Sequence, residues 1–406
     1  MSRKPPAAWV VGTFDTKAAE LNYLAGLLRA AGLRVVTVDI GTRSAPGVTD
    51  IEARAVASHH PRGVAAVFDP TDRGEAVIAM GDALAALVRQ RLARGEIQGM
   101  LGVGGSGGSS MIAPAMRLLP IGVPKLLVST MAAGDVSVYV GVVDMTLMYP
   151  VTDIAGLNRL SRIILANAAH ALAGMLLHRA PMDHALDKRS IGLTMFGVTT
   201  PCVQAVRGCL NDDFDAQVFH ANGAGGRTLE ALAAAGMLSA VLDVTTTEVG
   251  QHLAGGVCDA GPNRLDAAAR HGLPWVGSVG ALDMINWGAR ETIPARHQGR
   301  VFHVHNANVT LMRSNAEELE AAARRMAEQL NRSSGQVRLL LPLGGLSMLD
   351  APGQPFHDPA ADAVLFDTLE RCFIESDAHR LVRLPHHINE AAFASALAEH
   401  LRAVLP

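Results

Sequence analysis

Hydrophobic residues in the first half of the chain form short apolar runs separated by longer segments with helical spacing. The short runs predict strands at 7–11, 33–38, 98–103 and 123–129. The longer segments predict helices at 18–31, 73–94 and 156–178. Because short buried strands that alternate with helices are typical of βαβ units, we expect this half to form a parallel sheet.

The second half shows the same alternation of apolar runs and helical segments. Its predicted strands are 191–196, 217–220, 240–244, 275–280, 301–305, 337–341 and 381–384. Helices are predicted between several of them, including 315–330 and 389–403. A polar connector at 178–189 separates the halves, which gives an N-terminal α/β subdomain at 1–180 and a C-terminal one at 189–406.

The composition suits two packed domains in a reducing compartment. The chain has 406 residues, of which 49% are hydrophobic and 18% charged, and its net charge is −3. This charge, together with the scatter of the basic residues, argues against nucleic acid or a membrane as a partner. No apolar stretch reaches the length of about 18 residues that a membrane span needs, and the N-terminus lacks a signal-peptide core. Because the four cysteines are also isolated in sequence, we expect a cytoplasmic protein.

A glycine-rich run at 101–110 lies between a predicted strand and a helical segment. Glycine loses more freedom on folding than other residues, so this many glycines indicate a special backbone geometry. A glycine turn that opens a helix presents backbone N–H groups to an anion, which favours a phosphate. The alternative is a tight strand-to-helix turn without a ligand.

Two further strand ends carry groups that suit the same site. Lys17 follows the strand at 7–11, in the first turn of a helix, where a cation opposes the helix dipole unless an anion is present. Asp39 ends the next strand, as does the acid that binds a ribose hydroxyl in Rossmann folds. The alternatives are a solvated lysine and a turn carboxylate. The predicted nucleotide-contacting residues are Gly12, Thr13, Asp15, Thr16, Lys17, Asp39, Gly104, Gly105, Ser106, Gly107, Gly108, Ser109, Ser129 and Thr130.

The second half contains another glycine-rich strand-to-helix turn, at 219–228, in which Arg227 could bind an anion. Segments with polar residues at 245–248, 281–288, 303–306 and 342–347 end or follow other predicted strands, so we expect a small-molecule pocket. His220, His305 and Glu248 are candidates for acid–base catalysis, with Arg227 as an anion ligand. Glu248 could instead bind a metal together with one or both histidines. The alternatives are a structural histidine and a solvated glutamate.

Two other kinds of site receive less support from the sequence. Cys202 is predicted in the first turn of a helix, a position that lowers a thiol's pKa, and the alternative is a small buried hydrophobic residue. The histidine spacing lacks a metal-binding pattern, so no dedicated zinc site is expected.

Several long motifs resemble those of the Tm-one-like ATP-binding domain family, which is named for a tomato mosaic virus resistance protein and is uncharacterised in its bacterial members. The motifs are 12–17, 102–109, 124–135, 153–158, 194–201, 219–226, 242–248 and 305–313, and they extend over almost the whole chain. The resemblance implies two Rossmann-like, doubly wound subdomains, a homodimer and binding of ATP with Mg in the N-terminal half. It supplies no reaction.

Three functional hypotheses follow from these observations. The first is an ATP-binding protein that acts on or senses a small anionic metabolite through His220, Glu248 and Arg227. The second is a nucleotide-gated regulatory module without turnover. The third is a hydrolase or lyase for a keto-acid-like substrate, with ATP incidental.

Overall fold

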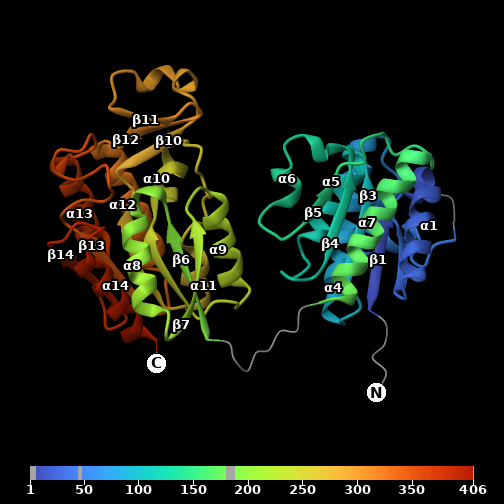
Figure 1. Cartoon of the computed structure of the whole chain (residues 1–406), viewed down its shortest axis with the longest axis horizontal. Helices are drawn as coiled ribbons and strands as arrows, with labels where there is room; N and C mark the ends of the chain where they lie inside the picture. Colours follow the sequence, from blue (N-terminus) through green and yellow to red (C-terminus); the bar gives the residue numbers. More distant parts are fainter. Residues whose placement is uncertain (1–5, 44–47, 180–187, 406) are drawn as a thin grey trace. The chain divides into compact units, whose positions relative to one another are not determined.

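The computed structural model describes residues 6–43, 48–179 and 188–405 (Figure 1). The chain divides into two compact units, Met1–Met182 and Asp183–Pro406. Most of the predicted connector at 178–189 lies outside the described residues. Each unit is built around its own parallel sheet, which confirms the predicted α/β fold of two Rossmann-like subdomains.

The sheet of unit 1 has five strands, which are β1 (Ala7–Gly12), β2 (Arg34–Asp39), β3 (Gly99–Gly104), β4 (Lys125–Ser129) and β5 (Thr146–Met148). They lie in the order β2-β1-β3-β4-β5, and all neighbours are parallel. The chain therefore winds in one direction from β1 to β2 and in the other from β3 to β5. Ligands of open α/β sheets bind where this reversal occurs, beyond the carboxyl ends of β1 and β3.

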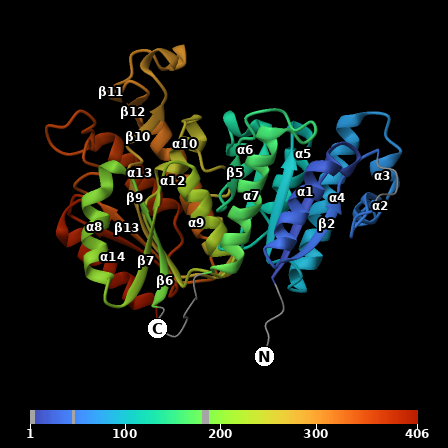
Figure 2. The same ribbon diagram turned by 45° about the vertical axis from the view of Figure 1, so that its right-hand side comes forward.

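Helices cover both faces of this sheet because its strands alternate two sets of apolar side chains. Ala8 and Val10 face the core formed with α1 (Phe14–Ala30) and α7 (Arg159–Leu177). Trp9 and Val11 face the opposite core, formed with α4 (Arg73–Ala93) and α5 (Ser106–Met116). Figure 2 labels these helices beside the sheet of unit 1. Shorter helices are α2 (Ala53–Ala57), α3 (Ala65–Phe68) and α6 (Ser137–Val140).

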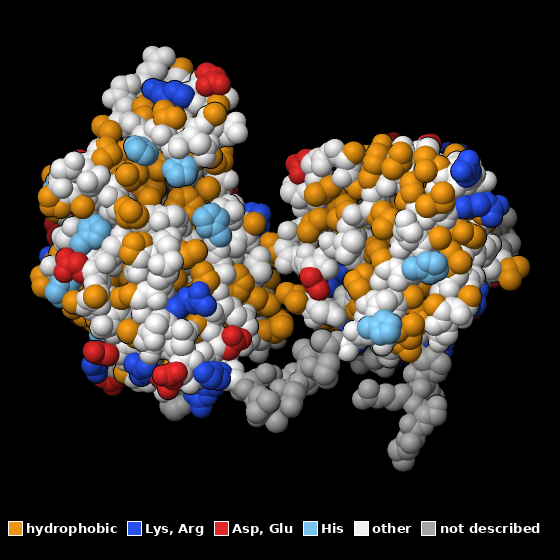
Figure 3. Space-filling model, in the orientation of Figure 1, with side chains coloured by type: hydrophobic (Ala, Val, Ile, Leu, Met, Phe, Trp, Pro, Cys, Tyr) orange, Lys and Arg blue, Asp and Glu red, His pale blue; other side chains and the backbone are white. Residues whose placement is uncertain are grey.

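The helix α7 is long and apolar enough to cross a membrane by length and composition alone. Its inner positions, Leu165, Leu172 and Leu176, are buried against the sheet and α1, as in a helix that covers a sheet. Its outer side carries exposed Leu160 and Ile163. Figure 3 shows hydrophobic side chains spread over the face of unit 1 on which α7 lies.

The main sheet of unit 2 has six strands, which are β6 (Arg189–Met195), β7 (Phe214–His220), β8 (Ala240–Thr245), β9 (Trp275–Gly280), β13 (Val337–Pro342) and β14 (His379–Leu384). Their order is β14-β13-β9-β8-β6-β7, again with parallel neighbours. One face packs against α8 (Thr200–Leu210) and α14 (Ala391–Val404). The other packs against α9 (Ala224–Ala234), α10 (Thr247–Ala254), α11 (Asp266–His271), α12 (Ala316–Leu330) and α13 (Pro359–Cys372).

A second, antiparallel sheet of unit 2 consists of β10 (Met284–Trp287), β12 (Val309–Arg313) and β11 (Phe302–Asn306), in that order. The strand predicted at 301–305 is therefore present, but it is not a strand of the parallel sheet. The prediction that the polar residues at 303–306 form one of that sheet's strand ends is wrong. Short apolar runs do not reveal which sheet a strand joins, because parallel and antiparallel neighbours can bury the same residues.

Candidate functional site

A cavity of about 370 Å³ lies at the point in unit 1 where the strand order reverses. The turn after β1 contributes one wall and the first turn of α5 another. The segment after β2 and the start of α4 complete it. The lining residues are Thr13, Asp15, Thr16, Lys17, Thr42, Arg43, Arg73, Val77, Gly105, Ser106, Gly107, Gly108 and Met111.

The sheet register places the predicted turns at one edge. Gly12 pairs with Val103 on β3 and with Asp39 on β2, so these strands end at the same level. A Cβ atom on Gly104 would lie 2.8 Å from the backbone of Gly108, so the last residue of β3 must lack a side chain for α5 to begin there. At Gly107, by contrast, a Cβ atom would meet no atom within 4 Å. Gly107 thus leaves open space on the wall of the cavity.

The start of α5 is suited to bind an anion. The first N–H groups of a helix have no partner within the helix and are usually satisfied by a capping side chain or a ligand. Here the N-cap residue is Gly105, and no side chain of the described residues caps the first turn. The N–H groups of Ser106, Gly107 and Gly108 are therefore available beside the cavity, where the helix dipole favours negative charge.

The charged side chains around the cavity are mostly cationic. Lys17, Arg43 and Arg73 line it, with Asp15 as the acidic side chain among its lining residues. The Nζ atom of Lys17 donates a hydrogen bond of 2.6 Å to the carbonyl of Ile154, so this side chain is held at the wall and does not extend into water. Sequence reasoning missed Arg43 and Arg73. The one available signal was the position of Arg73 at the start of the predicted helix at 73–94.

Three of the predicted nucleotide-contacting residues are buried and hydrogen-bonded within the protein. The buried Asp39 accepts hydrogen bonds from the backbone N–H groups of Phe14, at 3.0 Å, and Gly41, at 2.8 Å. The buried hydroxyls of Ser109 and Ser129 bond to each other at 2.6 Å. These contacts brace the turns around the cavity. Direct contact of the three residues, or of the partly exposed Thr130, with a nucleotide stays a prediction.

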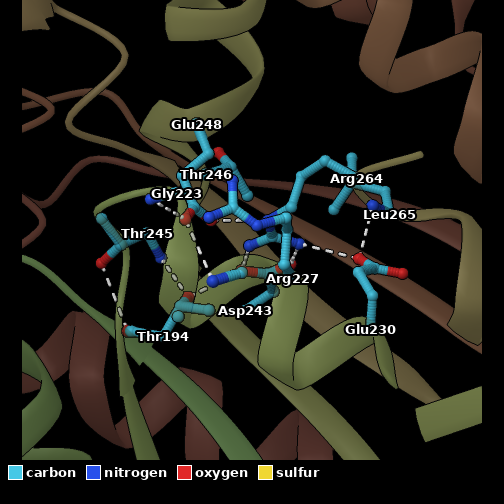
Figure 4. A network of polar contacts seen from close by, with 12 residues as sticks. Thr194, Gly223, Arg227, Glu230, Asp243, Thr245, Thr246, Glu248, Arg264 and Leu265 are labelled. Atoms are coloured by element: carbon cyan, nitrogen blue, oxygen red, sulfur yellow. Dashed lines mark hydrogen bonds and ion pairs between the residues drawn. The ribbon is translucent and has the colours of Figure 1, made fainter. Parts of the chain in front are cut away.

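The second glycine turn already contains an anion, which is a side chain of the protein. The carboxylate of Glu248 is fully buried, and its Oε1 atom accepts hydrogen bonds from the N–H groups of Gly223, at 2.7 Å, and Gly226, at 3.0 Å (Figure 4). A Cβ atom on Gly226 would overlap this carboxylate. The turn between β7 and α9 is therefore shaped around Glu248, and its N–H groups are used inside the fold.

Glu248 belongs to a buried network centred on Arg264. The guanidinium of Arg264 bonds to Oε2 of Glu248 at 2.7 Å, to both oxygens of Asp243 at 2.7 Å and to Glu230 at 3.2 Å. Burial alone would lower the pKa of Arg264, but the carboxylates of Asp243 and Glu248 outweigh it and raise that pKa. Burial raises the pKa of Glu230. Sequence reasoning missed this network, although Asp243 interrupts an apolar strand and so offered one signal.

The three predicted catalytic residues point to different partners. His220 is exposed and stacks on Phe196 with a ring separation of 5.2 Å. Arg227 is exposed and donates a hydrogen bond of 2.9 Å to the carbonyl of Asp259, whereas Glu248 turns inward to Arg264. The contacts of Glu248 are those of a positioning residue. Direct catalysis by any of the three stays a prediction.

Cys202 lies in the first turn of α8 as predicted, but it is fully buried. Burial raises the pKa of its thiol to about 12, against the lowering expected from its place in the helix. Of the two alternatives, the small buried hydrophobic residue describes Cys202. Among the residues that the structure describes, no group of three or more His, Cys, Asp or Glu side chains could hold a metal ion.

Comparison with known proteins gives the chain a family. Residues 6–181 match the N-terminal domain, and residues 188–405 the C-terminal domain, of the uncharacterised protein family UPF0261. The UPF0261 protein RA0729 of Rhizobium meliloti is 52% identical over 96% of both chains. The ToMV resistance protein Tm-1(GCR237) of Solanum lycopersicum is 38% identical over 99% of this chain and 56% of its own length.

Solved structures add little to this assignment. A UDP-GlcNAc 2-epimerase of Methanocaldococcus jannaschii aligns with 67% of this chain and 83% of its own. At 8% identity and a TM-score of 0.21, this likeness carries no argument about function. The assignment rests instead on the two domain matches and the long alignments, and by these the chain belongs to the UPF0261 family.

Proposed function

We propose that unit 1 binds ATP with Mg²⁺ in the cavity between the turn after β1 and the start of α5. The observation that carries this proposal is one cavity that combines an uncapped helix N-terminus with three cationic side chains. Its position at the reversal of strand order is where open α/β sheets hold their ligands. The phosphates would accept hydrogen bonds from the N–H groups of Ser106, Gly107 and Gly108.

The side chains at the cavity suit the remaining charges of a magnesium nucleotide. Lys17, Arg43 and Arg73 supply cations for the phosphate oxygens. The carboxylate of Asp15 and the hydroxyl of Thr16 are hard oxygen donors of the kind that Mg²⁺ prefers, and both lie at exposed positions. When bound, Mg²⁺ would neutralise part of the phosphate charge.

The protein is proposed to bind a small anionic metabolite as well as the nucleotide. The metabolite is either a substrate that the protein converts with ATP or an effector that it senses. Incubation with Mg-ATP, alone and with metabolite pools, separates the two cases, since turnover yields ADP or AMP. Without turnover, the nucleotide-gated regulatory module is the better description.

The phosphate dependence of binding tests the proposed site. Isothermal titration calorimetry would compare ATP, ADP, AMP and adenosine in the presence of Mg²⁺. Affinity is expected to fall along this series, because each lost phosphate removes charge-assisted hydrogen bonds worth about 1.5 kcal/mol or more. Equal affinity for adenosine and ATP would contradict a phosphate-binding turn.

A pair of arginine variants on α4 locates the site. Arg73→Ala removes a cation from the cavity wall, whereas Arg89→Ala removes one from an exposed position farther along the same helix. The first is expected to weaken ATP binding about tenfold, which corresponds to about 1.4 kcal/mol. The second is expected to leave it unchanged. If both variants bind ATP like the wild-type chain, the nucleotide does not occupy this cavity.

A further inference from the structure

Unit 2 has a cavity of its own, of about 210 Å³, at the carboxyl ends of β13 and β14. The first turns of α13 form one wall, on which Phe366 offers an apolar surface, and Leu343 after β13 adds a second apolar surface. Three ionisable side chains also line the cavity, and they are His357, Asp362 and Arg383. A cavity of this size, with an apolar body and a few polar groups, is typical of a site for a small ligand.

Asp362 connects this cavity to a buried ionic cluster. Its Oδ1 atom accepts a hydrogen bond of 2.7 Å from the guanidinium of Arg313. Arg313 also faces Asp350 at 3.9 Å, and its charge acts on the buried carboxyl group of Asp283. Three carboxyl groups thus surround one arginine, so one arginine charge cannot neutralise all three as carboxylates.

The excess negative charge of this cluster is reduced because two of its carboxyl groups keep their protons. Burial, together with the negative charge of the neighbouring Asp350, raises the pKa of Asp362 to about 8 and that of Asp283 to about 7. At neutral pH Asp362 therefore carries a proton, which it shares with Asp350 in a side-chain hydrogen bond, so the cavity wall at Asp362 is uncharged. A buried carboxylic acid that stays neutral at pH 7 is an arrangement found at ligand and active sites.

Two carboxyl oxygens of the cluster, Oδ1 of Asp283 and Oδ1 of Asp350, accept no hydrogen bond from an N–H or alcohol donor of the described residues. Asp350 is fully buried, and Nδ1 of His357 lies 3.9 Å from its Oδ1 atom. An unsatisfied buried carboxylate oxygen costs free energy unless a ligand or a small movement satisfies it. Because His357 also lines the cavity, a ligand there can draw this side chain into a hydrogen bond with Asp350. The cluster thus reaches the cavity through Asp362 and His357, which both line it.

We propose that this cavity binds a short-chain organic acid, whose carboxylate lies between Arg383 and Asp362 and whose hydrocarbon chain packs on Phe366 and Leu343. Arg383 is held at the rim by an ion pair with Glu370 and supplies the cation. This site is separate from the nucleotide site proposed in unit 1, and its test requires no nucleotide.

Binding is expected to depend on pH because Asp362 must keep its proton. The charged groups that face Asp362 are Arg313 from β12, Asp350 and His357 from the loop before α13, and Arg383 from β14. Above about pH 8 Asp362 ionises and repels the ligand's carboxylate. The affinity for the acid should therefore fall as the pH rises from 7 to 9.

Butyrate is a suitable probe, with n-butanol as its uncharged counterpart. Saturation-transfer NMR and calorimetry on the full chain are expected to detect binding of butyrate at pH 7. Binding of n-butanol is expected to be much weaker. Arg383→Gln should weaken butyrate binding at least fivefold. Arg380→Gln changes an arginine on the opposite side of the same strand and should leave butyrate binding unchanged. Asp362→Asn should bind butyrate with little change between pH 7 and 9, after circular dichroism has shown that the variant is folded.

Other outcomes would overturn the proposal. They are no detectable butyrate binding by the wild-type chain, equal binding of n-butanol, or an equal loss in the Arg380 and Arg383 variants. Because Mg-ATP is absent from these measurements, their failure is distinct from a failure of the nucleotide site.

Discussion

At the scale of single residues, Glu248 decides how the second glycine turn is used. Its carboxylate joins the turn's N–H groups to the buried guanidinium of Arg264. A glycine-rich turn can thus hold an anion that is a side chain from elsewhere in the sequence. In unit 1 no carboxylate of the described residues bonds to the first turn of α5, and this difference separates the two turns.

Glu248→Gln should destabilise the protein by about 3 kcal/mol, because loss of one charge leaves Arg264 with an incomplete set of buried partners. Chemical denaturation would measure the free energy of unfolding. Glu399→Gln, at an exposed position of α14, serves as the control and should change it by less than about 0.5 kcal/mol. A similar small effect at Glu248 would mean that the buried network contributes little to stability.

Asp283 should make stability depend on pH. Its pKa is raised to about 7 in the folded state by burial and by Asp350, so the folded chain holds a proton that the unfolded chain loses near pH 4. Its contribution to stability is therefore complete below about pH 4 and is lost as the pH rises through 7. Asp283→Asn should raise the free energy of unfolding at pH 8 by about 1 kcal/mol and have less effect at pH 5. Equal effects at both pH values would refute this account.

At the scale of helices and strands, the sequence predicted the regular α/β elements well. The strand β9 has the predicted bounds, and the helices predicted at 315–330 and 73–94 differ from α12 and α4 by one residue at an end. These segments have strong periodicity and clear caps, such as the capping box at Asn315. The strands β10 and β12 were missed because no helix separates β10 from β9 or β12 from β11, so the alternation of strands and helices does not mark them.

The candidate sites were predictable only in part. The glycine turn at the start of α5 was found because its signal is local. Arg73 and Arg43 were missed because separate segments bring them to the cavity. The carboxylate in the second turn could not be assigned because Glu248 lies 25 residues from Gly223 and any acidic residue might have filled it.

Close packing at the start of α9 predicts that one added methyl group strongly lowers the stability of the fold. A Cβ atom on Gly225 would overlap the carbonyl of His220, whereas one on Gly208 of α8 would meet nothing within 4 Å. Gly225→Ala should therefore lower the free energy of unfolding by about 2 kcal/mol or more. Gly208→Ala should raise it by up to about 1 kcal/mol through helix propensity. If both substitutions stabilise the protein, the turn is looser than described.

At the scale of the whole molecule, each unit has its own sheet and its own cores, and the two proposed ligand sites lie in different units. Hydrogen exchange with and without Mg-ATP should show protection at residues 13–17 and 105–109. Residues 220–226 are not expected to gain protection by direct contact, because Glu248 already bonds to that turn. Protection at 220–226 without any change at 105–109 would place the nucleotide in unit 2.

The most direct measurement of the central claim compares two alanine variants by calorimetric titration with Mg-ATP. Gly107→Ala adds a methyl group at the cavity wall, and Gly26→Ala adds one on the outer side of α1, both where the fold has room. Both variants should be at least as stable as the wild-type chain. We predict that Gly107→Ala lowers ATP affinity by about tenfold or more, which corresponds to about 1.4 kcal/mol, while Gly26→Ala leaves it unchanged. Unchanged affinity in the stable Gly107 variant would contradict the claim that phosphates bind at the start of α5.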